Sequence, residues 1–530
     1  MNTPNYINIK TKRLVRFFNT TGPCNPEDHY MLPPEERLVG AQLHRYIRDK
    51  LYWVLHAPRQ TGKTTFLQSW MREINSGDEA VSCYVTLERC QGVPEPERAM
   101  PAICDAITDA AQKNSLPVPS VETVNPQSQL NDILSNWAKL VAPKPLVVLF
   151  DETDVLTGDA LISFLRQLRG GFANRGIGIF PVSVALVGMR DLKDYITAAK
   201  DGIAPNPGSP FNIKEDSAVL ANFQQEDIAK LFAQRTQETG QQMTEEALAY
   251  AFDQSRGHPW IVNSLFKRAT MRILNEDSRE TVTLEHIRKA REQMILARET
   301  HLDSLAVRME DPKIRRVMET LISGEADPAL TEGEGFRICL DLGLVTIEKG
   351  TPIVANPIYR EVLARHITYG TQLAIPAPEW QWKKADGHLD MDALLREFQR
   401  FWRKHSEVWE QKSDYTEAFP HLLLMAFLQR VLNGGGRIER EYAAGRGRMD
   451  LGVEYNKRWY IIEIKLVHSY DTPEEVKEEG LRQTAMYRDK IDGAAPSYLL
   501  IFDRRPEAKQ KPWDERLTWT NEGTITVAGC

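Results

Sequence analysis

The 530-residue sequence lacks any apolar run near the roughly 20 residues that a membrane-spanning helix needs, so it predicts no transmembrane segment. Residues 1–13 lack the basic-then-apolar order of a signal peptide, and we expect the chain to stay in the cytoplasm. Paired cysteines are lacking as well. The six cysteines are scattered without CxxC spacing, which indicates reduced thiols and not a disulfide or zinc framework: Cys24, Cys83, Cys90, Cys104, Cys339 and Cys530.

An excess of positive charge is also lacking. The net charge of −7 argues against a protein that coats nucleic acid indiscriminately, although local basic clusters can still bind it. Internal repeats and low-complexity tracts are not found. At about 150 residues per domain, the length predicts three or four domains, each with its own core.

A phosphate-binding loop is present at residues 57–64, between the apolar strand expected at 51–56 and a helix. In such a loop the backbone N–H groups point at one anion, a lysine reaches the terminal phosphates and a hydroxyl binds Mg²⁺. Lys63 and Thr64 hold those two places. The nucleotide contacts that we predict are Ala57, which replaces the usual first glycine, and Thr61, Gly62, Lys63, Thr64 and Thr65.

An acidic pair completes this site. Asp151 and Glu152 directly follow the apolar run 145–150, which is typical of a buried parallel strand. We expect Asp151 to hold Mg²⁺ through water and Glu152 to polarise the attacking water. The alternative is a strand end with two solvated acids.

Two further residues are candidate nucleotide contacts with open alternatives. Arg190 follows the next predicted strand, 182–188, and either senses the γ-phosphate or forms a surface ion pair. Pro259 lies in Gly257-His258-Pro259, which is either an adenine contact or a turn between two helices.

The changing pattern of elements predicts the domains. Strands alternate with helices at first, beginning with a helix expected at 38–50, and this alternation indicates a doubly wound α/β core. A purely helical stretch and then a helix–helix–hairpin pattern follow. The boundaries that we predict are 1–37 for an irregular N-terminal segment, 38–223 for the P-loop ATPase core, 224–300 for a helical lid, 301–370 for a winged helix, 371–390 for a linker and 391–530 for a terminal α/β domain.

With these motifs, residues from about 20 to 370 resemble the bacterial AAA-like and STAND-like ATPases that carry a winged helix after the lid. Gly257-His258-Pro259 is similar to the adenine-side motif of the STAND class. The resemblance implies ATP and Mg²⁺ as ligands of the first site.

A second site is expected near the end of the chain. Glu463 and Lys465 are two apart on an apolar strand and therefore share one face, and Asp450 starts the hairpin partner of that strand. Burying such charges where they have no function costs several kcal/mol of folding free energy. Phosphodiester hydrolysis needs carboxylates that hold a metal and a cation that steadies the attacking water. We therefore predict Asp450 and Glu463 as metal ligands and Lys465 as a catalytic cation.

This arrangement resembles the PD-(D/E)XK nuclease superfamily over residues 416–502, and within it the RecB-like branch. The resemblance implies a restriction-endonuclease-like α/β fold that uses Mg²⁺, or Mn²⁺ in its place. It also implies that Glu417 is an upstream helical acid and that Gln483 and Tyr487 contact the nucleic-acid backbone.

Each of these secondary assignments has an alternative. Glu417 can instead be a helix-terminal acid stabilised by the macrodipole. Glu439 and Glu441 are rival acids, and Gln483 and Tyr487 can be ordinary helix surface. Arg446 and Arg448 belong to a local basic patch that either holds phosphates or is a solvated loop.

The combined interpretation is a multidomain α/β protein that acts as an ATP-regulated, Mg²⁺-dependent nuclease in bacterial defence or mobile-element biology. DNA is favoured over RNA as the substrate, a homo-oligomer is possible, and no membrane is involved. The rival is a STAND-like signalling or scaffold ATPase whose terminal domain binds nucleic acid without cutting, although the intact Asp450, Glu463 and Lys465 argue against it. A winged-helix transcription regulator is disfavoured because residues 331–342 contain a single basic residue, Arg337.

Overall fold

The structure is a computed structural model, and the chain divides into two compact units. The first contains Met1–Glu299, Arg337–Ile347 and Ala355–Ile358, and the second contains Thr300–Phe336, Glu348–Val354 and Tyr359–Cys530. The predicted winged-helix range is therefore divided between them. The residues that the structure describes are 16–39, 42–189, 214–297, 300–323, 328–374, 384–410, 419–432, 436–444, 447–467, 471–491 and 493–530.

The first unit is built on a sheet with the strand order β1-β6-β2-β5-β4-β3. All neighbouring pairs are parallel except β1 and β6, which are antiparallel. The central strands are continuous apolar runs because they are buried on both faces. The bounds are β1 Leu38–Val39, β2 Tyr52–His56, β3 Val81–Thr86, β4 Leu146–Asp151, β5 Ser183–Gly188 and β6 Lys214–Leu220.

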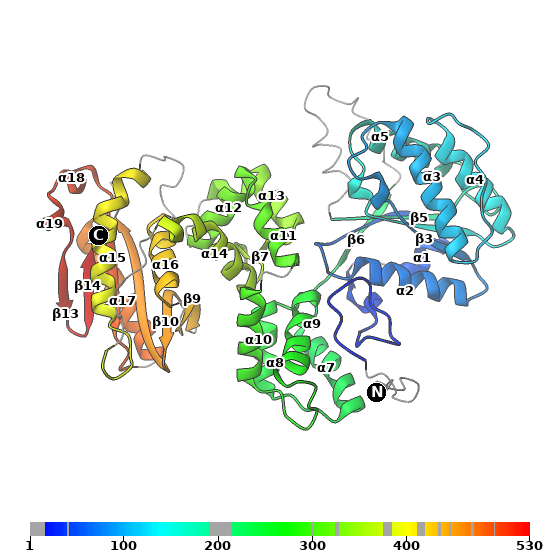
Figure 1. The fold of residues 1–530 in the computed structure, drawn as a ribbon. Coiled ribbons are helices and arrows are strands. Elements are labelled where there is room, and N and C mark those ends of the chain that lie inside the picture. Colours follow the sequence, from blue (N-terminus) through cyan, green and yellow to red (C-terminus); the bar gives the residue numbers. More distant parts are fainter. Residues whose placement is uncertain are drawn as a thin grey trace, which may run out of the picture. The chain divides into compact units, whose positions relative to one another are not determined.

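Helices cover both faces of this sheet, which confirms the doubly wound core (Figure 1). Side chains of a strand alternate between faces, so Tyr52 and Val54 pack with one helical layer while Trp53 and Leu55 pack with the other. The first layer contains α3 (Pro96–Lys113), α4 (Gln129–Val141) and α5 (Gly158–Phe172); the second contains α1 (Leu43–Arg48) and α2 (Lys63–Ser76). Short helical turns are η2 Pro34–Arg37, η3 Glu88–Cys90 and η4 Thr153–Val155.

The helix expected at 38–50 is wrong at its start. Leu38 and Val39 form β1 instead, because they pair with Leu220 and Val219 of β6 and extend the sheet. Among the described residues of that range, Leu43–Arg48 are helical, as α1.

The lid region is helical, as the sequence indicates. Its elements are α7 Gln225–Thr239, α8 Glu245–Ser255, α9 Pro259–Lys267, η5 Arg268–Ile273 and α10 Leu284–Leu296. The irregular N-terminal segment packs on these helices. The Phe18 ring lies 5.2 Å from the Phe266 ring, and the Trp260 indole N–H donates to the Thr20 carbonyl at 3.0 Å.

Beyond the lid the elements follow the predicted helix–helix–hairpin order. They are α11 Thr300–Arg308, α12 Pro312–Ser323, η6 Pro328–Glu332, α13 Glu334–Asp341, β7 Val345–Glu348, β8 Thr351–Val354 and α14 Pro357–Ala374. Helix α14 continues through Ala374, so its last residues lie in the range predicted as a linker.

The second unit contains a mixed sheet with the order β13-β14-β12-β11-β10-β9. Its strands are β9 Gly436–Ala444, β10 Gly447–Tyr455, β11 Arg458–Val467, β12 Ser497–Asp503, β13 Trp519–Glu522 and β14 Ile525–Gly529. The strands β11 and β12 are parallel and are joined by α17 (Pro473–Ile491), whereas β10 and β11 form an antiparallel hairpin. Two short helices, α18 Pro506–Lys509 and α19 Trp513–Arg516, precede β13.

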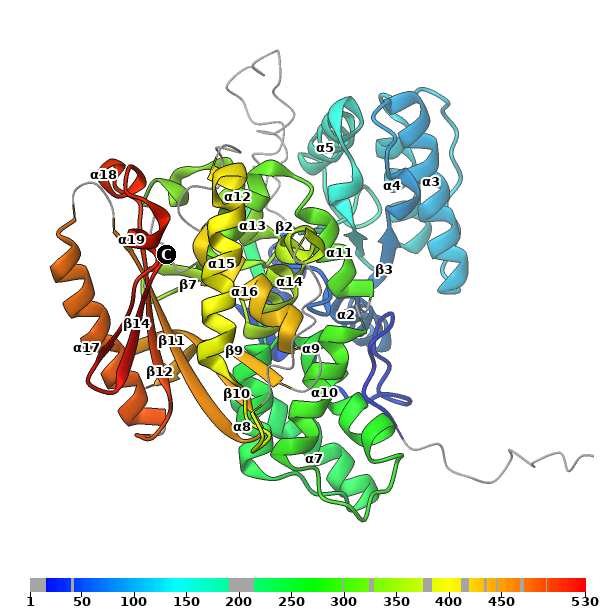
Figure 2. The same ribbon diagram turned by 60° about the vertical axis from the view of Figure 1, so that its left-hand side comes forward.

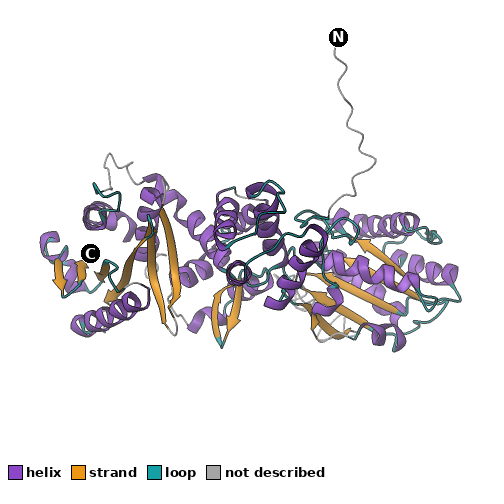
Figure 3. Cartoon of the chain, turned by 90° about the horizontal axis from the view of Figure 1, so that it is seen from below, coloured by secondary structure: helices purple, strands orange, loops and turns teal. Residues whose placement is uncertain are grey.

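Helices lie on the two faces of this sheet. Figure 2 shows α17 on one face and α15 (Met391–Glu410) with α16 (Phe419–Leu432) on the other. The Trp402 ring of α15 lies 4.9 Å from the Phe502 ring of β12 and joins this layer to the sheet, while the Phe398 ring of α15 lies 5.5 Å from the Phe427 ring of α16 and joins the two helices. Figure 3 shows the strands of both main sheets in orange with helices against them. Among the described residues, no helix is long and apolar enough to span a membrane.

Candidate functional site: a phosphate loop and a charged strand

The phosphate-binding loop lies between β2 and α2, as predicted. Gly62 precedes α2 with a φ of 97°, a conformation that favours glycine. The Lys63 ammonium donates to the carbonyls of Ala57 at 2.7 Å and Pro58 at 2.9 Å, and the Thr61 hydroxyl also donates to Pro58 at 2.8 Å. Lys63 thus lies folded back on its own loop, where it can exchange these carbonyls for phosphate oxygens.

The predicted acidic pair, Asp151 and Glu152, lies next to the phosphate-binding loop. The Thr64 hydroxyl donates to Asp151 Oδ2 at 2.7 Å, and the Tyr84 hydroxyl donates to the same oxygen at 3.2 Å. Glu152, at a φ of 58°, accepts from the Thr86 hydroxyl at 3.0 Å. The structure therefore brings Lys63, Thr64, Asp151 and Glu152 together, and it adds two residues of β3, Tyr84 and Thr86.

Burial shifts the charged groups of this site in opposite directions. Burial lowers the pKa of Lys63 to about 8, although the charges of Asp151 and Asp154 oppose that shift. Burial also raises the pKa of Asp151, against the Thr64 hydrogen bond and the Lys63 charge. The pKa of Glu152 is raised mainly by burial as well.

A hydroxyl next to a carboxylate is the oxygen donor set that Mg²⁺ prefers in proteins. Thr64 and Asp151 therefore fit a magnesium ion that accompanies a nucleotide. When bound, that ion would neutralise charge on the terminal phosphates.

Arg37 was missed by the sequence analysis. Its guanidinium donates to the Thr61 carbonyl at 2.5 Å and the Ala221 carbonyl at 2.9 Å, and it lies 4.7 Å from the centroid of the Phe223 ring. Burial lowers its pKa to about 10. Arg37 thus ties the phosphate loop to the segment that enters the lid, and its place in an irregular stretch without a motif gave no signal of this.

The remaining predicted nucleotide contacts are Pro259, Thr65 and Arg190. Pro259 begins α9, and Gly257 lies so close to Phe223 that a Cβ atom would stand 1.8 Å from its carbonyl oxygen. The segment is therefore a turn between α8 and α9, and its contact with adenine stays a prediction. Thr65 accepts a hydrogen bond from the Cys24 N–H at 3.0 Å. Arg190 lies outside the described residues.

The second site is centred on β11. Glu463 is 2% exposed, and Lys465 lies with its ammonium 3.4 Å from a Glu463 carboxylate oxygen. The hairpin register pairs Leu451 with Ile462, and Asp450 precedes Leu451 on β10. A buried carboxylate beside a lysine has the chemistry of a metal ligand and a catalytic cation.

Several other predicted residues of this site are not placed. Glu417 and Arg446 lie outside the described residues, and Asp450 and Arg448 are described only in backbone, within β10. Among the described side chains, no group of three or more His, Cys, Asp and Glu gathers as a metal site.

Helix α17 covers the face that carries Glu463 and Lys465. Gly480 lies so close that a Cβ atom there would be 3.2 Å from Lys465 Cγ and 2.7 Å from a Leu499 methyl carbon. Farther along, Gln483 donates to Glu479 at 2.9 Å, and Tyr487 packs with Ile461.

Tyr487 is 4% exposed, which gives it a place in the core of the second unit. Its contact with nucleic acid, like that of Gln483, stays a prediction. Gly480 was missed by the sequence analysis because nothing local marks a glycine that packs on another strand.

The two sites define the class. A P-loop ATPase-like core, with its phosphate loop and acid pair at the carboxyl ends of parallel strands, is joined in one chain to a PD-(D/E)XK nuclease domain. Residues 415–499 match the sequence family described as the PD-(D/E)XK nuclease superfamily, and this range contains Asp450, Glu463 and Lys465. A comparison with curated proteins finds no match.

Solved structures with remote similarity cover the first part of the chain. The Walker-type ATPase PABY2304 of Pyrococcus abyssi is 12% identical, with 65% of this chain and 99% of that chain covered and a TM-score of 0.47. Cdc6p from Pyrobaculum aerophilum is 15% identical, covering 62% and 91% with a TM-score of 0.35. The RuvB Holliday junction branch migration motor of Thermotoga maritima is 16% identical, covering 60% and 90% with a TM-score of 0.31.

The low pKa of Lys63 predicts a pH-dependent affinity for ATP. A nucleotide needs the protonated ammonium, and in the nucleotide-free protein that proton is lost as the pH rises through about 8. The affinity should be constant below that pH and should fall about tenfold for each pH unit above it. Equilibrium binding of a fluorescent ATP analogue between pH 6.5 and 9.5 measures this.

Lys63→Arg is the matched variant, because a guanidinium stays charged over the whole range. Its affinity should be lower but independent of pH. A wild-type affinity that stays flat to pH 9.5 would contradict the shifted pKa.

The contact of Gly480 with Lys465 predicts a loss of cleavage in Gly480→Ala. The added methyl group crowds Leu499 and the Lys465 side chain, so α17 or these side chains must shift, and misplacement of a reacting group by about 1 Å can cost about 100-fold in rate. We expect kcat for nucleic-acid cleavage to fall about tenfold or more while KM stays near its wild-type value.

Gly493→Ala is the control, because a Cβ atom at Gly493 would meet nothing within 4 Å. It should cleave at the wild-type rate. If Gly480→Ala also cleaved at that rate, the packing of α17 would not position Lys465.

Proposed function

We propose that the chain is an ATP-regulated, Mg²⁺-dependent nuclease that cleaves DNA phosphodiesters in bacterial defence or mobile-element biology. In this proposal Asp450 and Glu463 hold the metal, which can also be Mn²⁺, and Lys465 steadies the attacking water. Glu417 assists the metal site, and Gln483, Tyr487, Arg446 and Arg448 contact the substrate. ATP binds at Lys63, Thr64 and Asp151, with Glu152 as the water-polarising base.

The buried Glu463 with the half-buried Lys465 beside it carries the nuclease part of the proposal. A carboxylate that is 2% exposed, with an ammonium 3.4 Å away on the same apolar strand, costs free energy to bury, so a purely structural role would favour an apolar residue at position 463. Their range falls within the nuclease-family match. A domain that only binds nucleic acid would not need both groups.

Motif similarity and the state of the cysteines support the setting of the proposal. The similarity of the nuclease motifs to the RecB-like branch favours DNA over RNA. All six cysteines are free thiols, which supports a reducing compartment such as the cytoplasm. We also keep the predicted domain boundaries and the winged helix at 301–370 as proposals.

Regulation by ATP is supported by a contact on the phosphate loop. Gly343, in the turn between α13 and β7, lies against the Pro58 ring so closely that a Cβ atom would stand 2.5 Å from it. The Pro58 carbonyl accepts from Lys63, so a nucleotide that draws Lys63 away changes the loop at this residue. After Gly343 the chain enters the second unit at Glu348–Val354, returns to the first at Ala355–Ile358 and then continues in the second unit to its end. The contact of Gly343 with Pro58 therefore supports a route by which the nucleotide affects the nuclease.

The nuclease assignment predicts that Glu463→Gln abolishes metal-dependent cleavage. The substitution keeps the shape of the side chain and removes the charge that holds the metal. Loss of a residue that only hydrogen-bonds to a metal ligand already costs about 10- to 100-fold in metal affinity or activity. Loss of a ligand itself should therefore lower the cleavage rate by about 100-fold or more. The assay uses labelled single- and double-stranded DNA and RNA with Mg²⁺, with and without ATP.

Binding of ATP to Glu463→Gln should match that of the wild type, which shows that the ATPase unit is intact. Cleavage by purified Glu463→Gln at the wild-type rate would refute the active site. Wild-type cleavage of RNA in preference to DNA would refute the substrate class alone.

Regulation predicts that cleavage depends on the nucleotide state. A ligand shifts an equilibrium only through different affinities for its two states, and coupling of about 1–3 kcal/mol is typical. The cleavage rate of the wild type should therefore differ at least about fivefold with and without ATP. Lys63→Ala should lose this response, and Glu152→Gln should keep ATP binding but slow hydrolysis.

Two glycine variants test the route. Gly343→Ala should weaken the response of cleavage to ATP because its methyl group displaces Pro58. Gly350→Ala is the matched control, since Gly350 also has a positive φ but would meet nothing within 4 Å. Equal cleavage rates with and without ATP in the wild type would contradict the regulation, and equal responses in both variants would contradict the route.

A further inference from the structure

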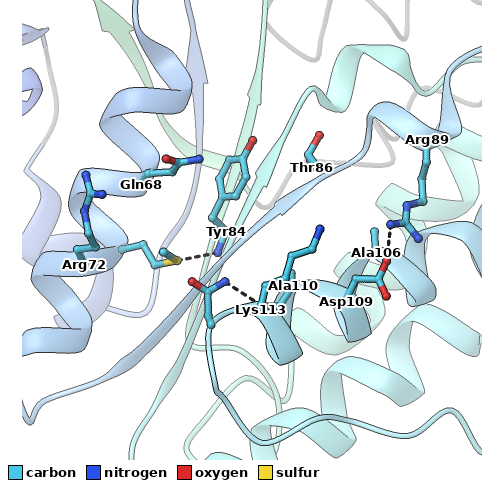
Figure 4. A pocket seen from close by; sticks show the side chains of 11 residues that line it. Gln68, Arg72, Tyr84, Thr86, Arg89, Ala106, Asp109, Ala110 and Lys113 are labelled. Carbon is cyan, nitrogen blue, oxygen red and sulfur yellow. Dashed lines mark hydrogen bonds and ion pairs between the residues drawn. The ribbon is translucent and has the colours of Figure 1, made fainter. Parts of the chain in front are cut away.

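A cavity of about 410 Å³ lies at the outer edge of the ATPase sheet, away from the phosphate loop itself. Strand β3 is the last strand of the sheet, and α2 and α3 pack on opposite faces beside it. Figure 4 shows the cavity between these three elements. Its lining side chains come from α2 (Gln68, Met71, Arg72), from β3 and the turn after it (Tyr84, Thr86, Arg89) and from α3 and its end (Ala106, Asp109, Ala110, Lys113, Asn114).

The exposed edge of β3 is not open to another strand. The outward N–H of Ser82 donates to the Asn75 side chain at 2.7 Å, and Asn75 in turn donates to the Ser82 carbonyl at 2.8 Å. The N–H of Tyr84 meets the Met71 sulfur at 3.3 Å. Because these backbone groups are already bonded, the cavity does not suit an added β-strand.

The charge of the cavity indicates an anion. Three cations line it, namely Arg72, Arg89 and Lys113, against one carboxylate, Asp109. Asp109 is bonded to Arg89 at 2.6 Å and its charge also acts on Lys113, so the lining as a whole keeps two more cations than carboxylates. This excess stands out in a chain whose net charge is −7.

The volume of the cavity and its other lining side chains limit which ligands can bind. The volume falls within the range of small-molecule sites, which is about 300–1,000 Å³. Buried apolar side chains of Met71, Ala106 and Ala110 form part of the wall, and the amides of Gln68 and Asn114 add polar groups. A compact anion with a phosphate group or several carboxylates fits the volume, the positive charge and the polar groups of this cavity.

One residue joins the cavity to the catalytic acids. Tyr84 lines the cavity, and its hydroxyl donates to Asp151 Oδ2 at 3.2 Å, the oxygen that Thr64 also contacts. A ligand packed against Tyr84 therefore acts on a group that orients the predicted Mg²⁺ ligand. Neither the phosphate loop nor Lys63 lines this cavity.

We propose that the cavity between α2, β3 and α3 is an effector site for a small multivalent oxyanion, and that Tyr84 transmits its occupancy to Asp151. The site is separate from the nucleotide site, so both can be filled together. The regulatory half of the proposal rests on the ATP hydrolysis proposed above, whereas the binding half does not.

The binding test uses inorganic phosphate and citrate as probes, titrated by calorimetry into the protein saturated with Mg²⁺ and a non-hydrolysable ATP analogue. The analogue fills the phosphate loop, so added anions report on the cavity. We expect saturable binding of at least one probe, weakened about tenfold or more in Arg72→Gln and Lys113→Gln. No saturable binding of either probe below 10 mM, or equal binding by the variants, would overturn the site.

The choice between the probes identifies the source of the ligand. Tighter binding of phosphate points to the product of ATP hydrolysis, and tighter binding of citrate points to a carboxylated metabolite. Either result supports the oxyanion site.

The coupling test measures ATP turnover with and without the bound probe. We expect a change of about fivefold or more in the wild type. The change should be absent in Lys113→Gln, which keeps basal turnover because Lys113 does not touch the acid pair.

Tyr84→Phe separates binding from transmission, since it keeps the ring in the wall and removes only the hydroxyl. It should bind the probe as the wild type does and lose the change in turnover. A probe that binds the wild type without changing its turnover, or a normal response in Tyr84→Phe, would overturn the coupling. Absence of ATP turnover without any probe would instead count against the proposed ATPase.

Discussion

The hydrogen bond between Thr64 and Asp151 is the interaction on which the ATPase unit depends, because it joins two segments far apart in sequence. Thr64 follows β2 and Asp151 ends β4, and the order of the sheet puts β5 between those strands. The parallel register brings the carboxyl ends of all three strands to one edge. Every other group of the site, from Lys63 to Glu152 and Tyr84, takes its place relative to this edge.

The sequence could predict the residues that carry the chemistry because their signals are local. Lys63 and Thr64 stand at a fixed spacing in a glycine-containing loop, and Asp151 follows an apolar run that only a buried strand explains. The same holds for Glu463 and Lys465, whose separation of two fixes them on one face of β11. The doubly wound core followed from these strands and from the helices between them.

The residues that support those groups could not be predicted, since their roles arise from contacts across the fold. Arg37 reaches Thr61 and Ala221 from an irregular segment, and no local pattern marks it as buried. Tyr84 looks like an ordinary strand residue until β3 is placed beside β4. Leu38 and Val39 were expected in a helix, but their partners in β6 lie more than 170 residues away, and pairing with a sheet overrides a local helical pattern.

Close contacts of glycine residues are a second feature that the sequence could not predict, because they join segments far apart in the chain. Gly343 and Gly480 each let a segment approach a functional residue, Pro58 in one case and Lys465 in the other. A glycine in a turn or a helix has many reasons to be there, so its type alone says nothing about its neighbour. The burial of Tyr487 is a related case, because the spacing of Gln483 and Tyr487 fits a surface motif while the fold places the ring against Ile461.

The opposite pKa shifts at the phosphate loop have a common origin in burial without compensation. The Lys63 ammonium donates to two carbonyls and lies near acids, but it loses solvation that these contacts do not restore. Asp151 loses solvation in the same way, and two hydroxyls, the Glu152 N–H and the charge of Lys63 do not fully stabilise its carboxylate. Phosphate oxygens would stabilise the protonated Lys63, and a magnesium ion would stabilise the ionised Asp151. The site is therefore electrostatically incomplete in both signs, and a nucleotide together with a divalent cation would complete both at once.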